Sequence, residues 1–237
     1  MFNKKLWKRK TMNNYKYKEQ SGRSMIEMLG VLAIIGVLSV GGIAGYSKAM
    51  NKFKTNKVAD NVSMLVANIK TLYAQQNTYT GLNNVTAVDM GVVPDELVVK
   101  RAANATTQSL INAFNGPVFI TASNGTNGTD GKAFIIEFTE LSREACITLA
   151  TNDWGSGYSS GLIAIAAKGN SGASHTTPTA ASNTLDSIYI GAEGSDADGT
   201  AIATPGGTVA VPLSVTKAAK ACNCSTGNTC SILWKYY

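Results

Sequence analysis

The stretch that decides the fold is KEQSGRSMIEMLGVLAIIGVLSV, which runs from Lys18 to Val40. It begins a hydrophobic run, and Met28–Ser47 contains no charged residue over 20 positions, long enough for a helix to span a bilayer. Glu27 lies at the leading edge of this run. A charged side chain at the centre of a membrane helix costs about 2.5 to 3.5 kcal/mol, so such residues are rare and usually functional. The carboxylate of Glu27 therefore needs a specific role.

The hydrophobic run continues into an amphipathic segment without any proline or turn cluster. Apolar residues recur there at spacings of four and three, the pattern of a helix with one apolar side; they are Val58, Val62, Leu65, Ile69 and Leu72. The sequence therefore predicts a single helix from about Ser24 to Gln76. Its first half is apolar all round, and its second half needs a partner surface.

The positive charge is concentrated before the hydrophobic run. The whole chain has a formal net charge of +6, and residues 1–22 contain seven Lys and Arg against Glu19 alone. The rest of the chain is therefore electrically balanced. A short basic segment before an apolar helix fits the positive-inside rule. A DNA-binding arm is the competing interpretation, but the body of the chain has no charge excess that would favour nucleic acid.

The chain after residue 76 has the mixed pattern of an α+β domain. We expect an irregular connection first, because Gly81, Gly91 and Pro94 interrupt it. A helix with Ser142 as its N-cap is expected later. The predicted helices are Thr106–Phe114 and Leu141–Ala150, and the predicted strands are Val118–Ala122, Ala133–Phe138, Leu162–Ala166, Ser187–Ile190, Thr208–Val211 and the final CSILWKYY. Surface loops are expected at 124–131, 168–184 and 192–205.

All four cysteines follow the hydrophobic run; they are Cys146, Cys222, Cys224 and Cys230. Charged residues make up only 15% of the chain, which is typical of a secreted or surface protein. An even number of cysteines in such a protein predicts two disulfides, for which three pairings are possible. Zinc is the alternative, but the spacing C-x-C-x5-C fits no common zinc finger and His175 is the sole histidine, so no metal site is expected.

The residue types give an enzymatic function little support. His175 lies in the loop sequence GASHTTP, and no Ser-His-Asp or Cys-His arrangement has an obvious frame, so neither catalytic residues nor a cofactor are expected. The segment GAEGSDADGT carries Glu193, Asp196 and Asp198, whose oxygen atoms could bind calcium. It lacks the full EF-hand pattern, and a solvated acidic loop is the simpler interpretation.

A conventional secretory signal is an alternative explanation of the first 44 residues. The sequence GGIA, at Gly41–Ala44, could supply a cleavage site of small residues. The basic region would be unusually long for such a signal, and the apolar helix continues directly into the amphipathic one. We therefore expect the hydrophobic helix to remain in the mature protein.

The segment SGRSMIEMLGVLAIIGVLSV resembles the processing site of type IV prepilins. In that family a peptidase cuts after a glycine that precedes the hydrophobic helix, and glutamate is the fifth residue of the mature chain. Cutting after Gly22 makes Arg23 the first residue, which the family methylates on its amino group, and Glu27 the fifth. Arg23 departs from the family, in which the first mature residue is usually hydrophobic.

Later segments resemble type IVb pilins in particular. They are ANIKTLYAQQNTYTGLNN, LINAFNGPVFI, LSREACITLATNDW and the final cysteine followed by a strand. The resemblance implies a long N-terminal helix packed on an antiparallel-rich β-sheet. It also implies a leader at 1–22, a membrane and assembly segment at 23–50, and an extracellular globular domain at 51–237. Among the disulfide pairings it favours Cys146 with Cys222, with Cys224 as the other candidate, and a local bridge to Cys230.

The resemblance implies a structural subunit that sits in the inner membrane and then polymerises into an extracellular filament. Its partners would be other copies of itself, a prepilin peptidase, an inner-membrane platform and an assembly ATPase. Glu27 would pair with the α-amino group of Arg23 on an adjacent subunit and fix the axial offset between helices. A solvated carboxylate at a helix start is the simpler role for Glu27. A minor pilin, a pseudopilin of a secretion system, and an exported enzyme or binding protein with an anchor remain the alternative functions.

Overall fold

The computed structural model describes residues 24–100, 107–125, 131–155, 161–169, 189–190, 215–222, 224 and 229–237. The leader with Gly22, the residue Arg23, His175, the acidic segment 193–198, most of the predicted surface loops and the predicted strand Thr208–Val211 lie outside these residues. The chain divides into two compact units, Met1–Tyr46 and Ser47–Tyr237.

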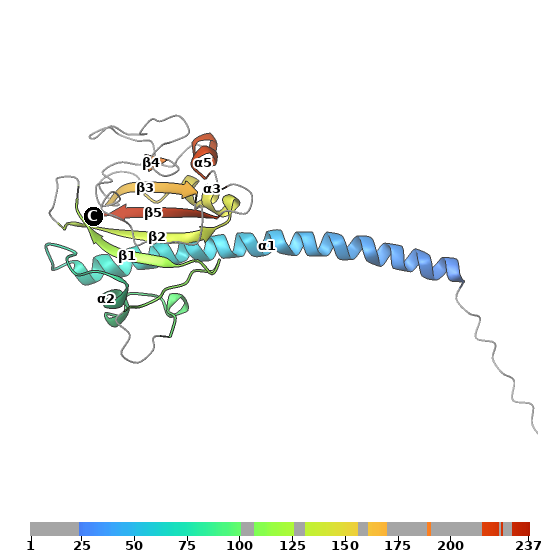
Figure 1. Ribbon diagram of the computed structural model, residues 1–237, viewed down its shortest axis with the longest axis horizontal. Coiled ribbons are helices and arrows are strands. Elements are labelled where there is room, and N and C mark those ends of the chain that lie inside the picture. Colours follow the sequence, from blue (N-terminus) through green and yellow to red (C-terminus); the bar gives the residue numbers. More distant parts are fainter. Residues whose placement is uncertain are drawn as a thin grey trace, which may run out of the picture. The chain divides into compact units, whose positions relative to one another are not determined.

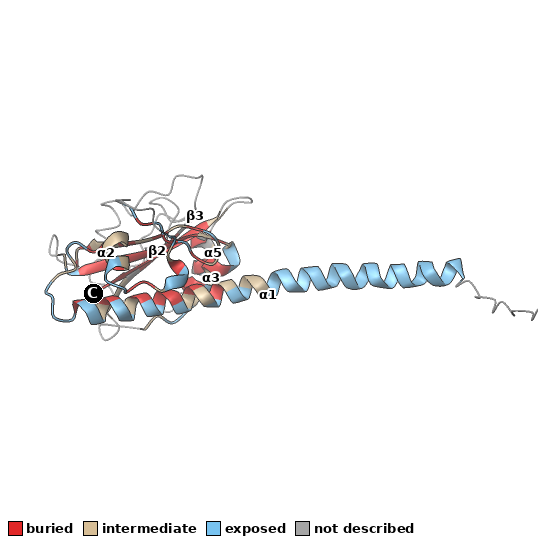
Figure 2. Cartoon of the chain, turned by 90° about the horizontal axis from the view of Figure 1, so that it is seen from below, coloured by how far each residue is buried: buried red, intermediate tan, exposed pale blue. Residues whose placement is uncertain are grey.

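The first element is the helix α1, which runs from Met25 to Tyr73 over 49 residues and confirms the predicted single helix (Figure 1). Within the second unit one side of α1 is buried (Figure 2), and the buried residues are Thr55, Val58, Asn61, Val62, Leu65, Ile69 and Tyr73. The prediction was wrong at Leu72, which is 43% exposed. Tyr73 takes the last buried position instead, because its ring packs against Tyr79 with the centroids 5.1 Å apart.

A five-stranded sheet forms the body of the second unit. Its strands are β1 (Val118–Ser123), β2 (Ala133–Leu141), β3 (Leu162–Gly169), β4 (Tyr189–Ile190) and β5 (Cys230–Tyr236), in the spatial order β1-β2-β5-β3-β4. All neighbouring pairs are antiparallel except β3 and β4, which are parallel. The predicted antiparallel-rich sheet is thus confirmed, and the C-terminal strand lies at its centre.

Alternate residues of the central strands face α1, as the period of two in a β-strand requires. In the register of β2 and β5, Phe134 pairs with Tyr236 and Ile136 with Trp234. These four residues belong to one buried cluster with the apolar stripe of α1. Burying a side chain such as Leu65 contributes about 1.5 to 3 kcal/mol, so the helix and the sheet stabilise each other.

Four short helices complete the described structure. The helix α3 (Arg143–Thr151) was predicted, and the hydroxyl of Ser142 caps it by accepting a hydrogen bond from the backbone N–H of Ala145. The helix α2 (Asn84–Asp89) and the 3₁₀ helix η1 (Asp95–Leu97) lie in the segment that we expected to be irregular, and α5 (Val215–Ala221) was also missed. Asn83 and Thr86 form a capping box at the start of α2, a signal that the sequence does contain.

The predicted helix Thr106–Phe114 is wrong over 107–114, where the chain is extended and then turns. Leu110 bridges Val98 in the antiparallel sense, which takes its backbone out of a helix. The side chain of Asn112 then organises the turn: its Nδ2 donates to the carbonyl of Thr139 at 2.7 Å, and its Oδ1 accepts from the N–H of Gly116 at 3.1 Å. A Cβ at Gly116 would overlap that same carbonyl of Thr139, so this close approach requires glycine.

The packing of α1 on the sheet gives a direct test. Replacing Leu65, which is fully buried, by alanine should lower the free energy of unfolding of the second unit by about 2 to 5 kcal/mol, because a cavity replaces the side chain. Chemical denaturation of the full chain in detergent, followed by near-UV circular dichroism, measures this. The adjacent Met64, which is 47% exposed, provides the control, since Met64→Ala should change the stability by less than about 0.5 kcal/mol. Equal effects at both positions would contradict the packing.

Candidate assembly site

Glu27 lies in the first turn of α1, and its side chain is exposed in the single chain. A carboxylate is favoured there because the first turn of a helix carries a partial positive charge. Arg23 and Gly22, the residues expected to flank the processing point, lie outside the described residues. The structure therefore places Glu27 at the start of the apolar helix.

The surface of α1 in the first unit is apolar and exposed. Met25 and Val37 are 84% and 75% exposed. The other large hydrophobic side chains on this surface are Ile26, Met28, Leu29, Val31, Leu32, Ile34, Ile35, Leu38, Val40, Ile43 and Tyr46. By its length and composition α1 could cross a membrane. A surface of this kind must be covered by lipid or by other helices, because soluble monomers rarely expose apolar patches of that size to water.

Five glycines lie on the same apolar part of α1; they are Gly30, Gly36, Gly41, Gly42 and Gly45. A Cβ built at any of them meets no atom within 4 Å among the residues that the structure describes. Each glycine costs about 0.5 to 1 kcal/mol of helix stability relative to alanine. No contact within the single chain uses the space that the missing side chains leave. Close packing of a neighbouring helix would use it and would offset the lost helix stability.

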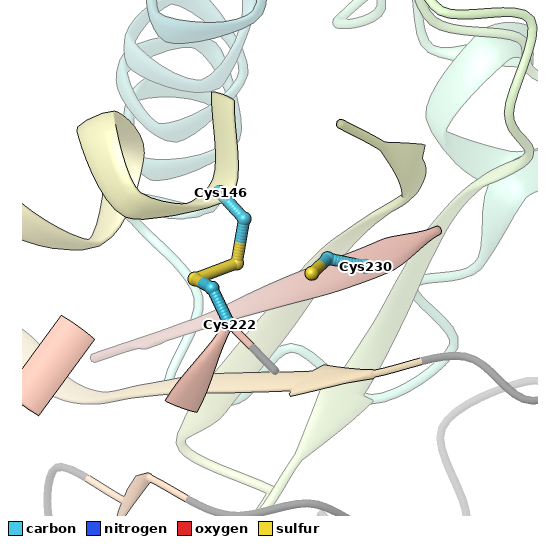
Figure 3. Close-up of side chains that lie close together, drawn as sticks. All are labelled: Cys146, Cys222 and Cys230. Atoms are coloured by element: carbon cyan, nitrogen blue, oxygen red, sulfur yellow. A yellow bond between two sulfur atoms is a disulfide. The ribbon is translucent and has the colours of Figure 1, made fainter. Parts of the chain in front are cut away.

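The cysteines form two bridges close to the start of β5. Cys146 on α3 is joined to Cys222, which follows α5, with the Cα atoms 5.9 Å apart (Figure 3). Cys224 is joined to Cys230 at the start of β5, with the Cα atoms 5.5 Å apart. These are the pairings that the sequence resemblance favoured. The guanidinium of Arg143 also ties α5 to α3, because it donates to the carbonyl oxygens of Cys222 and Ala219 at 3.2 and 3.3 Å.

A shallow groove of about 280 Å³ lies beside the part of α1 at the start of the second unit, from Ser47 to Lys54. The sequence did not predict it. Its lining comprises Ser47, Met50, Asn51, Lys54, Phe114, Glu140, Ser142 and Thr229. Several of its polar groups already bind one another: Ser142 donates to Asn51 at 2.9 Å, and Thr229 donates to the carboxylate of Glu140. The first contact joins α1 to the start of α3, and the second joins β2 to the segment before β5, so the packing of the domain explains the groove.

Lys70 and Tyr236 connect α1 to the last strand. The Nζ of Lys70 lies 5.0 Å from the centroid of the Tyr236 ring, a distance suited to a cation–π interaction. Burial lowers the pKa of Lys70 and raises the pKa of Tyr236, because each charged form would lose hydration. The backbone N–H of Tyr237 donates to the carbonyl of Gly161 at 2.8 Å. The end of the chain is therefore held between α1 and β3.

These features together define a class of protein: a pilin, with an apolar N-terminal helix, a glutamate in its first turn and a disulfide-tied sheet domain. The sequence matches the family model described as PilS N terminal over residues 52–190, which is more than half of the chain. The chain belongs to this family and is a type IVb pilin.

Two curated relatives share the same class. The major structural subunit of the bundle-forming pilus of Escherichia coli O127:H6 is 27% identical over 142 residues, which cover 60% of this chain and 68% of the relative. The toxin coregulated pilin of Vibrio cholerae is 27% identical over 153 residues, covering 63% of this chain and 66% of that protein.

Two solved structures overlap with the chain more loosely. One is a type IVb pilin from Salmonella typhi, with a TM-score of 0.43 and 13% identity, covering 73% of this chain and 93% of that one. The other is TcpA, a type IV pilin of the Vibrio cholerae El Tor biotype, with a TM-score of 0.48 and 18% identity, covering 78% of this chain and 99% of that one. The family assignment rests on the family model and on the sequence relatives.

The two bridges should differ in what they contribute to stability. Cys146 and Cys222 are 76 residues apart, so the chain-entropy model gives their bridge about 4.5 kcal/mol. Cys224 and Cys230 are 6 residues apart, and the same model gives about 2 kcal/mol. The double variant Cys146→Ser with Cys222→Ser should therefore lose more stability than Cys224→Ser with Cys230→Ser. Thermal unfolding of both full-length proteins measures the difference, and the opposite order would refute this assignment of the bridges.

Proposed function

We propose that this pilin is a structural subunit that polymerises through the apolar part of α1 into an extracellular filament. The observation that carries the proposal is the exposed surface of α1, which is free of charge from Met28 to Ser47 and begins directly after Glu27. A filament subunit needs a large surface that only other copies cover, and this surface meets that need. The relative in Escherichia coli is the major structural subunit of a pilus.

Within the filament we assign Glu27 the task of fixing the offset between neighbouring helices. Hydrophobic burial is non-directional, so apolar rods alone would accept many axial positions. A carboxylate buried among apolar side chains costs several kcal/mol unless it is paired. The α-amino group of Arg23 on an adjacent subunit is the partner that we propose, and it comes within reach at one axial step. The pair acts mainly as a register device, because desolvation consumes most of its attraction.

Three further steps belong to the same proposal. A prepilin peptidase cuts after Gly22 and exposes the amino group of Arg23, which is then methylated. Before the cut the subunit lies in the inner membrane, with the apolar part of α1 as its single span and the basic leader on the cytoplasmic side. An inner-membrane platform and a cytoplasmic ATPase then move subunits into the growing filament. In each of these steps the chain is what is cut, methylated or moved, so we propose a structural and not an enzymatic role for it.

The processing point is tested by the mature amino terminus. We expect mass spectrometry of the chain purified from cells to find Arg23 as the first residue, with or without a methyl group. A mature chain that starts at Gly45, as a conventional signal cleaved after Ala44 would give, would remove α1's apolar part and with it the whole proposal.

The register role of Glu27 is tested by Glu27→Gln, which keeps the size and removes the charge. The neighbour's buried amino group then loses its partner, at a cost of about 3 to 5 kcal/mol. Since about 1.4 kcal/mol is a factor of ten in affinity, sheared filaments should fall by more than about a hundredfold while the cell-associated subunit remains. Glu96→Gln is the matched control, because its ion pair with Lys57 at 2.7 Å is exposed and contributes little. Normal filaments from the Glu27 variant would exclude the register role.

A further inference from the structure

The two disulfide bridges meet at Cys230. The Sγ atoms of Cys146, Cys222 and Cys230 all lie within 4.8 Å of one another, although Cys230 is bonded to Cys224 rather than to either of the others. Figure 3 shows the sulfur of Cys230 directed toward the Cys146–Cys222 bond. A sulfur atom at that distance can reach a disulfide by a change of its side-chain rotamer. Three of the four cysteines therefore form one reactive cluster.

The four sulfur atoms differ in their access to solvent. Cys146, Cys222 and Cys230 are completely buried, with exposed fractions of 0%. Cys224 is partly exposed, and its Sγ lies 3.5 Å from the carbonyl oxygen of Cys222. A dissolved thiol can therefore approach the Cys224 end of one bridge, while the folded chain shields the Cys146–Cys222 bridge from direct attack.

We propose that Cys224 is a reaction site for small thiols, and that Cys230 passes the exchange on to the buried bridge. In the first step the external thiolate bonds to Sγ of Cys224, the Cys224–Cys230 bond breaks, and the electron pair leaves on Sγ of Cys230. In the second step Cys230 bonds to Sγ of Cys146 or Cys222. The Cys146–Cys222 bond breaks, and the displaced sulfur takes the electron pair. The second step moves the bridge without any net oxidation or reduction.

The surroundings of the cluster favour this exchange. Thiolates are the attacking and leaving species, and nearby cationic side chains stabilise them. The guanidinium of Arg143 lies next to the backbone of Cys222, because its Nε donates to the carbonyl oxygen of that residue at 3.2 Å. Cys146 belongs to the first turns of α3, where the helix end also favours negative charge. The first step leaves a thiolate on Cys230, and this thiolate lies where it can attack the Cys146–Cys222 bond in the second step.

The consequence is that a bridge out of reach of solvent becomes sensitive to external thiols through its neighbour. This inference depends on the positions of the sulfur atoms within the second unit and is independent of whether the chain forms filaments. The reagent is any small thiol, such as glutathione.

A matched pair of variants separates the two ends of the outer bridge. Cys224→Ser leaves Cys230 unpaired inside the cluster, whereas Cys230→Ser leaves Cys224 unpaired outside it. The full-length proteins are purified in detergent, quenched in acid, alkylated and mapped by mass spectrometry. We expect the Cys224 variant to contain molecules in which Cys230 is bridged to Cys146 or Cys222. The Cys230 variant should contain only the Cys146–Cys222 bridge and an alkylated Cys224. Finding the Cys146–Cys222 bridge in every molecule of both variants would overturn the proposal.

The wild-type chain gives a second measurement that needs no variant to fold. It is incubated with reduced glutathione under native conditions and mapped in the same way. We expect glutathione on Cys224, together with new bridges that contain Cys230 and either Cys146 or Cys222. Glutathione on Cys230, an adduct on Cys224 beside a wholly intact Cys146–Cys222 bridge, or the absence of any adduct would each refute the relay.

Discussion

Between Met25 and Tyr46, α1 exposes apolar side chains that no other part of the described chain covers. The need to cover this surface governs the behaviour of the subunit. The second part of the same helix has a complete set of partners, because Val58, Leu65 and Ile69 are buried in the core. One continuous helix thus has two parts whose apolar side chains are covered in different ways. The sheet domain covers the second part permanently. Lipid or neighbouring helices must cover the first part, and the membrane residence and the polymerisation that we propose would each do so.

The elements with strong local periodicity could be predicted from the sequence. The helix α1, the strands β1 and β2, and the cap at Ser142 depend on spacings and on capping residues that act over a few positions. The helix expected at Thr106–Phe114 failed because Asn112 forms its bonds with Thr139, far along the chain. The helix α2 was missed because six residues give too little periodicity, although its capping box was visible.

The candidate site could be predicted only in part, for the same reason. Glu27 stands out in the sequence because a carboxylate conflicts with the apolar residues around it. Spacing alone left three possible pairings of the cysteines, because it does not reveal which sulfur atoms meet. The family resemblance reduced them to two, with Cys146 bonded to Cys222 or to Cys224. The approach of Cys230 to the other bridge, and the contacts of Arg143 with α5, join residues distant in sequence. Such contacts exist only after the sheet and the helices have packed, so no local pattern announces them.

The position of β5 has a consequence for how the subunit is made. This strand contains the last residues of the chain, yet it lies between β2 and β3 and pairs with both. Until β5 has been made, β2 and β3 have no common neighbour and the core lacks Trp234. The earlier strands therefore wait for the one that joins them. Folding of the sheet is tied in this way to the order in which its strands are synthesised.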